Sequence, residues 1–254
     1  MRFPGSLIVI LLLTGCSGAD VKYFHVKIND SFPHDERSYV QGFEYHEGLF
    51  WETSGQYGKS FFSIWNPATG RKVQYKSIPE VFAEGMTRIG EKLYVLTWKA
   101  GVCYVYNLPD MQIEKKAGYK GEGWGLTNNG VYLIMSNGTD KLVFRDPVSF
   151  EKVKELAVTL NGKPLRFLNE LEYCGESIWA NVYLRKKIVE INPDTGKVLS
   201  VVDLSQLPLK QDRVDGEEVL NGIAFNKKTG ALYVTGKYWA RVYEVELVRD
   251  PEKN

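Results

Sequence analysis

Residues 84–107 read EGMTRIGEKLYVLTWKAGVCYVYN, and this stretch indicates the fold class. A short apolar segment is followed by a glycine turn, an aromatic-rich segment, a second glycine turn and another aromatic-rich segment. Short runs of β-branched and aromatic residues between turn residues are typical of consecutive β-strands. The stretch therefore predicts several short strands joined by tight turns.

The same pattern occurs five times along the chain. The five copies start with short motifs, four of which contain glycine, namely Gln41-Gly42-Phe43, Glu84-Gly85-Met86, Gly123-Trp124-Gly125, Asn169-Glu170-Leu171 and Asn221-Gly222-Ile223. An aromatic-rich second strand and an apolar third strand follow each start, and four copies continue into a turn and a fourth strand. The spacing is close to the ~40–45 residues of a four-stranded propeller blade.

These repeats predict an all-β, five-bladed β-propeller with four-stranded blades. The last repeat stops after three strands, at Val242–Leu247, and the segment Tyr23–Ile28 precedes the first full repeat. We expect that early segment to supply the missing outer strand and close the ring, because closure removes exposed sheet edges. A two-sheet sandwich is the alternative, although sandwiches rarely show five similar repeats.

The N-terminus is typical of an export signal. Met1-Arg2 is positively charged, and residues 7–13 form an apolar run that is too short to span a bilayer. The run ends in Leu13-Thr14-Gly15-Cys16, which resembles the bacterial lipoprotein box. We therefore expect residues 1–15 to be a lipoprotein signal peptide, residues 16–31 to hold the lipidated Cys16 and the closing strand, and residues 32–254 to form the propeller catalytic domain. A plain secretory signal is the alternative.

This interpretation predicts an exported protein of the bacterial cell envelope, lipid-anchored in the periplasm or on the outer membrane. The net charge is +1, from 32 basic and 31 acidic residues, so nucleic acid is not an expected partner. Cys103 and Cys174 fall in different repeats and are expected to be separate thiols. The three histidines lack paired-ligand spacing, and neither a metal site nor a cofactor is predicted.

The repeat starts carry polar residues among aromatic ones, and in a propeller these positions converge at one end of the central channel. The informative segments are Tyr39-Val40-Gln41-Gly42, Phe82-Ala83-Glu84-Gly85, Leu168-Asn169-Glu170-Leu171 and Thr235-Gly236-Lys237-Tyr238-Trp239. With these segments in order, the sequence resembles the propeller-type glutaminyl-peptide cyclotransferases (glutamine cyclotransferases) of plants and bacteria. The resemblance extends from about Phe32 to Leu247.

The resemblance implies an enzyme that converts an N-terminal glutamine of a peptide or protein into pyroglutamate and releases ammonia. It implies that Glu84, Asn169 and Lys237 are catalytic residues. It also implies a substrate-binding set, consisting of Gln41, Phe82, Trp98, Trp124 and Tyr183. Two positions depart from the family pattern, because Tyr39 stands where phenylalanine is common and Tyr183 where tryptophan is expected.

Those residue types suit the chemistry of cyclisation. One carboxyl group can accept a proton from the attacking α-amine and deliver it to the departing nitrogen, and Glu84 is the candidate. Aromatic neighbours would raise the pKa of Glu84, whereas Lys237 would lower it. Lys237 and the amide of Asn169 are suitable donors to the oxygen that becomes negative in the tetrahedral intermediate.

Each assignment has a structural alternative. Glu84 could cap a turn, Asn169 could bond backbone groups between blades, Lys237 could be a solvated strand end, and the tryptophans could pack between blades. The acidic residues Asp212, Asp215, Glu217 and Glu218 lack calcium-loop spacing and are interpreted as a solvated loop. The alternative functions are a non-catalytic envelope propeller that binds peptides or glycans, and a hydrolase of small amides. The expected partner is a substrate with a free N-terminal glutamine, and a monomer is expected.

Overall fold

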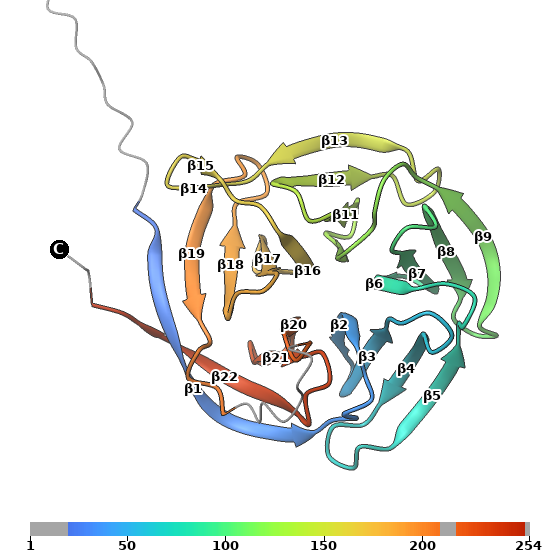
Figure 1. The fold of residues 1–254 in the computed structure, drawn as a ribbon, viewed down its shortest axis with the longest axis horizontal. Coiled ribbons are helices and arrows are strands. Elements are labelled where there is room, and N and C mark those ends of the chain that lie inside the picture. The colour runs from blue at the N-terminus through green and yellow to red at the C-terminus, as the bar shows by residue number, and fades with distance from the viewer. Residues whose placement is uncertain (1–19, 209–216, 252–254) are drawn as a thin grey trace, which may run out of the picture.

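A computed structural model describes residues 20–208 and 217–251, and each regular element in these ranges is a β-strand. Figure 1 shows the sheets side by side around a central axis, with β2, β6, β16 and β20 near the centre. The predicted all-β, propeller-like architecture is confirmed, and the two-layer sandwich is excluded because the sheets surround an axis. The predicted signal peptide and Cys16 lie outside the described residues.

Three sheets contain four antiparallel strands each, ordered along the chain from the axis outward. They are β2 (Val40–His46), β3 (Leu49–Ser54), β4 (Phe61–Trp65) and β5 (Lys72–Ser77); β6 (Ala83–Ile89), β7 (Lys92–Thr97), β8 (Val102–Asn107) and β9 (Gln112–Gly118); and β10 (Leu126–Asn128), β11 (Leu133–Met135), β12 (Lys141–Arg145) and β13 (Lys152–Ala157). In the first sheet β4 is buried throughout, whereas β5 alternates between half-buried and exposed residues. This alternation is expected for an outer strand with one face toward solvent.

The remaining large sheet has eight strands and includes both ends of the described chain. Its spatial order is β16 (Leu168–Cys174), β17 (Ser177–Val182), β18 (Lys187–Ile191), β19 (Val198–Asp203), β1 (Lys22–Pro33), β22 (Arg241–Arg249), β21 (Leu232–Gly236) and β20 (Leu220–Phe225). Strand β1 is antiparallel to β22 and parallel to β19. It therefore supplies the outer strand that the last repeat lacks, as the sequence pattern predicts. A short hairpin, β14 (Thr159–Leu160) and β15 (Lys163–Pro164), lies outside these sheets.

The inner strands form a closed cycle, in which β2, β6, β10, β16 and β20 contact one another in order and β20 contacts β2. This close approach requires glycine in the repeat starts. A Cβ atom on Gly85 would lie 2.4 Å from the Leu126 nitrogen, and one on Gly125 would lie 2.0 Å from the Asn169 oxygen. The fourth repeat carries Glu170 where other repeats have this glycine.

The hydrophobic core lies between neighbouring sheets. One cluster joins Phe62 of β4 to Met86 and Leu93 of the next sheet. Another joins Phe144 of β12 to Leu171 of β16. Full burial of each such side chain contributes about 1.5–3 kcal/mol, so these contacts stabilise the packing of adjacent sheets.

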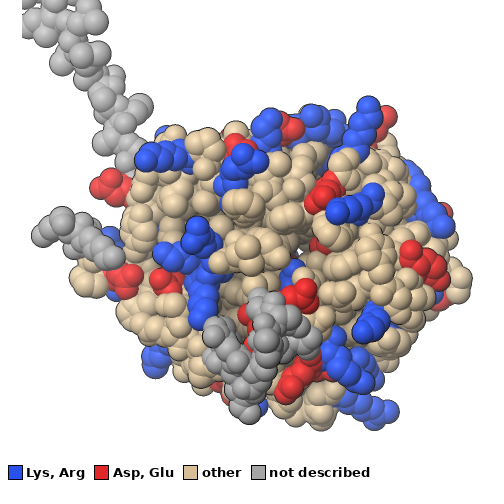
Figure 2. Space-filling view, viewed as in Figure 1, with Lys and Arg blue, Asp and Glu red and all other residues tan. Residues whose placement is uncertain are grey.

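Both predicted thiols are free, with Cys103 buried and Cys174 partly buried, which confirms the expectation of two separate cysteines. Among the described residues, no helix has the length and apolar character needed to cross a membrane. Basic and acidic side chains are interspersed on the face seen in Figure 2, and no large patch of one sign gathers there.

Candidate active site

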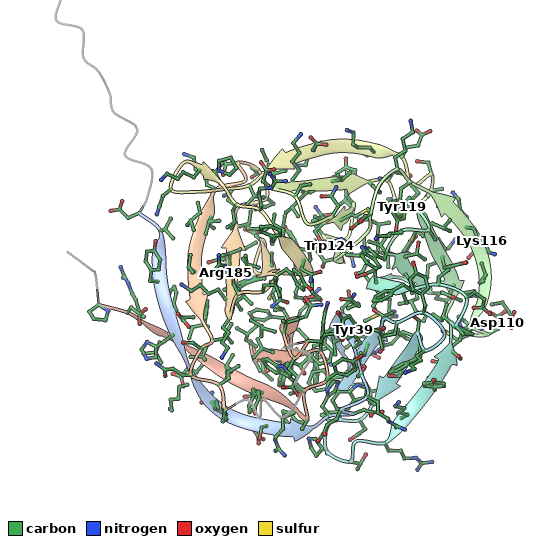
Figure 3. All side chains as sticks on the ribbon, viewed as in Figure 1. Tyr39, Asp110, Lys116, Tyr119, Trp124 and Arg185 are labelled. Atoms are coloured by element: carbon green, nitrogen blue, oxygen red, sulfur yellow. The ribbon has the colours of Figure 1, made fainter. Side chains whose placement is uncertain are left out.

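A cavity of about 410 Å³ lies where the inner strands begin, and its lining contains all eight predicted catalytic and substrate-binding residues. Among the described residues, twelve line it, namely Tyr39, Gln41, Gln56, Tyr57, Phe82, Glu84, Trp98, Trp124, Asn169, Tyr183, Glu217 and Lys237. In Figure 3, Tyr39 and Trp124 lie toward the centre of the ring, whereas Asp110 and Lys116 lie at its periphery. The repeat therefore brings residues from distant parts of the chain to one place.

One recurring backbone hydrogen bond explains this convergence. In four repeats the residue after the second strand donates its N–H to the carbonyl just before the first strand. The pairs are Gly55 to Tyr39, Trp98 to Phe82, Tyr183 to Phe167, and Lys237 to Val219. Trp98, Tyr183 and Lys237 are thus structural equivalents with different chemistry. The fold repeats the position, and the sequence varies the side chain presented there.

Glu84 is a buried carboxyl group on β6 and is 4% exposed. Its Oε1 accepts a hydrogen bond from Nε2 of Gln41 at 2.9 Å. Asn221 orients that amide, because its Nδ2 donates to the Gln41 Oε1 at 3.1 Å and to the Val40 carbonyl at 2.9 Å. The Gln41 nitrogen is therefore the atom directed at Glu84, and the carboxyl is not a cap on a turn.

The pKa of Glu84 is well above its usual value. Burial raises the pKa, the charge of Lys237 lowers it, and the nearby charge of Glu122 raises it. Desolvation outweighs the attraction to Lys237 because a carboxylate loses its hydration inside the protein. Glu84 is therefore suited to exchanging a proton closer to neutral pH than an exposed glutamate.

Lys237 is also buried and is 3% exposed, so it is not the solvated strand end that the sequence allowed. Its Nζ lies 4.3 Å from the ring centre of Tyr39 and 5.1 Å from that of Tyr183. Burial lowers the pKa of Lys237 to about 8, although the charges of Glu84 and Glu217 oppose this change. The ammonium group is held by aromatic faces and nearby carboxylates.

The turn that carries Lys237 is anchored to the first repeat. Tyr238 has a left-handed backbone with φ of 60°, and its N–H donates to the Ser38 carbonyl at 2.7 Å. His34 Nδ1 donates to the Trp239 carbonyl at 2.7 Å, and His34 Nε2 bonds to Glu52 at 2.7 Å. Burial lowers the pKa of His34, whereas the charge of Glu52 and its hydrogen bond raise it. The contributions that raise the pKa are larger in sum, so the pKa of His34 lies above its usual value. This buried ion pair fixes the turn.

Asn169 lies on β16, is 3% exposed, and lines the cavity. Its backbone carbonyl accepts a hydrogen bond from the Ser136 hydroxyl at 2.7 Å. The same hydroxyl accepts the Gly125 N–H at 2.7 Å, so Ser136 connects the residue before β10 to the inner strand β16. The Asn169 carbonyl therefore helps to join adjacent repeats, and the residue also lines the cavity.

Aromatic rings form the walls of the cavity. The ring centres of Tyr39 and Phe82 are 5.9 Å apart, and those of Phe82 and Trp98 are 5.3 Å apart. On another side, Trp124 meets Tyr183 edge to face at 5.6 Å. These rings pack against one another and also line the cavity, so packing and binding are not exclusive alternatives. They withdraw Glu84 and Lys237 from water.

Sequence reasoning missed several lining residues. The sequence comparison identifies Tyr39 only as a departure from the family pattern. Gln56 and Tyr57 follow the second strand of the first repeat, and Tyr57 packs against Phe82 at 5.5 Å while 59% exposed. Gln56 and Tyr57 directly follow Gly55, which is the equivalent of Trp98 in the first repeat. This position could have indicated that they lie near the cavity. Long irregular loops after a strand give no comparable periodicity.

The acidic segment that the sequence pattern indicates to be a solvated loop contributes one residue to the site. Glu217 lines the cavity, and its charge raises the pKa of Lys237. Asp212 and Asp215 lie outside the described residues. Within the described part of the chain, no cluster of three or more His, Cys, Asp or Glu side chains is arranged to hold a metal ion.

Comparisons with known proteins point to one family. Residues 6–247 match the family described as "Glutamine cyclotransferase". A curated Arabidopsis thaliana protein, "Glutaminyl-peptide cyclotransferase", is 33% identical over 248 residues, which cover 94% of this chain and 77% of that protein. The crystal structure of Myxococcus xanthus glutaminyl cyclase matches with a TM-score of 0.86 and 33% identity, covering 91% of this chain and all of the other.

A more distant likeness concerns the fold alone. The WD40 β-propeller domain of Doa1 matches with a TM-score of 0.50 and 10% identity, covering 84% of this chain and 64% of that one. At this identity only the arrangement of the sheets is shared.

Proposed function

Because the chain belongs to the glutamine cyclotransferase family, we propose that it converts the N-terminal glutamine of peptides or proteins into pyroglutamate and releases ammonia. The observation that carries the proposal is the shared cavity of Glu84, Asn169 and Lys237, which contribute one carboxyl, one amide and one ammonium group. These three groups come from repeats that are far apart in the sequence.

The proposed reaction is intramolecular. The substrate's α-amine nitrogen attacks the carbon of its own side-chain amide and forms a five-membered ring, and the bond to the amide nitrogen then breaks. The protein must fold the glutamine side chain back on itself, and such positioning can remove much of the barrier. A cavity of about 410 Å³ with rigid aromatic walls is suited to this task.

Glu84 moves the proton in this proposal. Its carboxylate accepts a proton from the attacking amine and delivers the proton to the departing nitrogen, which leaves as ammonia. The raised pKa of Glu84 supports this role, because a carboxyl group with a raised pKa is a stronger base than an ordinary glutamate and still gives up its proton. Gln41 holds one oxygen of the carboxyl, and the other oxygen is left for the substrate.

Lys237 and Asn169 act on the oxygen of the reacting amide. That oxygen becomes negatively charged in the tetrahedral intermediate, and an ammonium and an amide N–H stabilise it by donating hydrogen bonds. Phe82, Trp98, Trp124 and Tyr183 bind the apolar part of the side chain. Their rings also attract the substrate's α-ammonium group before it loses its proton.

The test is an assay of the full chain with a glutamine-initiated dipeptide. We expect ammonia release together with a cyclic product that has lost the mass of one ammonia molecule. A linear glutamate product would instead identify a hydrolase of amides. Binding of the dipeptide without any product would favour the second candidate, a non-catalytic envelope propeller that binds peptides or glycans in the aromatic-lined cavity.

We also infer that the eight-stranded sheet is two four-stranded blades joined through β1 and β19, so that the ring has five blades. The closed cycle of five inner strands supports this interpretation. A closed ring has no free inner edge to pair with another copy, and we propose a monomer. Light scattering after size-exclusion chromatography tests the oligomeric state.

For the cellular location, we propose that residues 1–15 are a lipoprotein signal peptide and that Cys16 is acylated. The support is the sequence pattern of Leu13 to Cys16. The protein would then be anchored in the bacterial cell envelope, with residues 32–254 forming the catalytic domain. Fractionation tests this, because Cys16→Ser should move the protein from the membrane fraction to the soluble fraction.

A further inference from the structure

Glu122 connects two aromatic walls of the cavity through a single oxygen atom. Its Oε2 accepts the indole N–H of Trp98 at 2.7 Å and that of Trp124 at 2.9 Å. Trp98 follows β7 and Trp124 precedes β10, so the carboxylate joins side chains of two different sheets. The Gly123 N–H also donates to the Trp98 carbonyl at 3.0 Å, which keeps the two segments together.

We propose that Glu122 is a positioning residue that fixes the orientation of the Trp98 and Trp124 rings and thereby the shape of the glutamine pocket. This inference rests on the proposed function for its kinetic consequences. An indole has one polar group, its N–H, and can only donate. A carboxylate acceptor makes that hydrogen bond stronger than a neutral one would be.

The orientation of each indole affects the position of a neighbouring ring that also lines the cavity. Trp98 packs against Phe82 with an interplanar angle of 61°, and Trp124 packs against Tyr183 with an angle of 75°. The Lys99 Nζ lies 3.9 Å from the ring centre of Trp98. A rotation of either indole would therefore disturb an edge-to-face contact and change the space offered to the substrate.

The charge of Glu122 has a second effect on the site. Burial is the main cause of the raised pKa of Glu84, and Lys237 opposes it, but the charge of Glu122 adds to the increase. Among the other groups around Glu84, Gln41 is neutral, and the tyrosines Tyr39, Tyr119 and Tyr183 all have raised pKa values. Glu122 thus acts on the pocket through hydrogen bonds and on Glu84 through its charge.

The two effects are separated by two substitutions in the full chain. Glu122→Ala removes the acceptor, and we expect the KM for a glutamine-initiated dipeptide to rise about tenfold or more, because two indole N–H groups lose a charged partner. Glu122→Gln keeps a carbonyl oxygen for the indoles but removes the charge. We expect its KM to stay within about twofold of wild type, while the limb of the kcat–pH profile set by Glu84 moves to lower pH.

Glu190→Ala is the matched control. Its carboxylate also accepts two side-chain hydrogen bonds, from Ser177 at 2.9 Å and Ser200 at 2.8 Å, but it lies outside the lining of the cavity. We expect this variant to keep the wild-type KM. An increase in KM equal to that of Glu122→Ala would overturn the proposal, as would a Glu122→Gln variant with a KM as high as that of Glu122→Ala.

A readout independent of catalysis keeps the inference testable if the proposed function fails. The chain has 6 tryptophans, so a nitrogen-labelled sample gives a small set of indole N–H signals. Glu122→Ala should shift two of these signals and accelerate their hydrogen exchange, whereas Glu190→Ala should not. Unchanged indole signals in Glu122→Ala would overturn the positioning role, and a wild-type protein that releases no ammonia would overturn the proposed function alone.

Discussion

Two buried carboxyl groups on the inner strands, Glu84 and Glu170, make an instructive pair. Glu84 is 4% exposed and Glu170 is 1% exposed, and burial is the main cause that raises both pKa values well above the usual range. Their partners differ. The Glu170 oxygens accept the backbone N–H groups of Phe43 at 3.3 Å and Ile223 at 2.8 Å, whereas Glu84 is bonded by the side chain of Gln41 and lines the cavity.

The comparison shows that a raised pKa does not by itself identify a catalytic group. Both oxygens of Glu170 are used to join inner strands of different repeats, so this carboxyl group serves the closed ring. Glu84 is buried to a similar extent and also lines a cavity. Access to substrate, rather than the pKa, separates the structural carboxyl from the candidate catalytic one.

The largest expected effect comes from Glu84→Gln. Loss of the proton shuttle should lower kcat by about 10²–10⁴-fold, measured as ammonia release from a glutamine-initiated dipeptide. The folded-state pKa of Glu84 is raised, so its contribution to stability falls as pH rises from the unfolded pKa toward the folded one. Glutamine lacks this penalty, and the variant should melt at the wild-type temperature or above it at neutral pH. Full activity would remove Glu84 from the mechanism.

Glu170→Ala should produce the opposite pattern. Two buried backbone N–H groups lose their acceptor, and the free energy of unfolding should fall by about 2–4 kcal/mol. Denaturant unfolding measures this loss, and the protein that remains folded should keep a kcat close to wild type. A variant of normal stability with strongly reduced kcat would mean that the two carboxyl groups had been assigned the wrong way round.

Lys237→Arg tests whether the positive charge beside Glu84 is needed for activity. The pKa of Lys237 is about 8, so kcat should decline at higher pH as the ammonium group loses its proton. Arginine stays charged, and the decline should disappear, even if the altered geometry lowers kcat overall. The measurement is kcat at saturating substrate, because the α-amine of the free substrate also titrates near this pH. A decline that persists in the variant would belong to another group.

Tyr183→Trp has the smallest expected effect. It restores the residue that the family pattern led us to expect, and the Lys237 Nζ lies 5.1 Å from the Tyr183 ring centre. A tryptophan ring attracts a cation somewhat more strongly than tyrosine, so KM should change by only about twofold. A much larger change would show that the tyrosine at this position is itself a determinant of substrate fit.

Much of the site was predictable because the repeat places equivalent residues at equivalent points. The repeat places Glu84 and Asn169 at starts of first strands and Trp98 and Lys237 at ends of second strands, and the resemblance to the family implies their roles. Gln56 and Tyr57 were missed because they lie in an irregular loop. Glu217 was not predicted, because a cluster of acidic residues indicates only that a segment is hydrophilic. It does not indicate whether the segment lies against the cavity.

The sequence by itself determined the all-β class, the strand repeats and the positions from which side chains reach the axis, because alternation and turn chemistry are local properties. Only the tertiary structure decided which residues become partners across the ring. It directed the Gln41 nitrogen at Glu84, buried Lys237 between tyrosine rings, and joined two indoles at Glu122. Hydrogen bonds and desolvation depend on distances of a few ångströms between residues far apart along the chain, and these distances exist only once the sheets have packed around the axis.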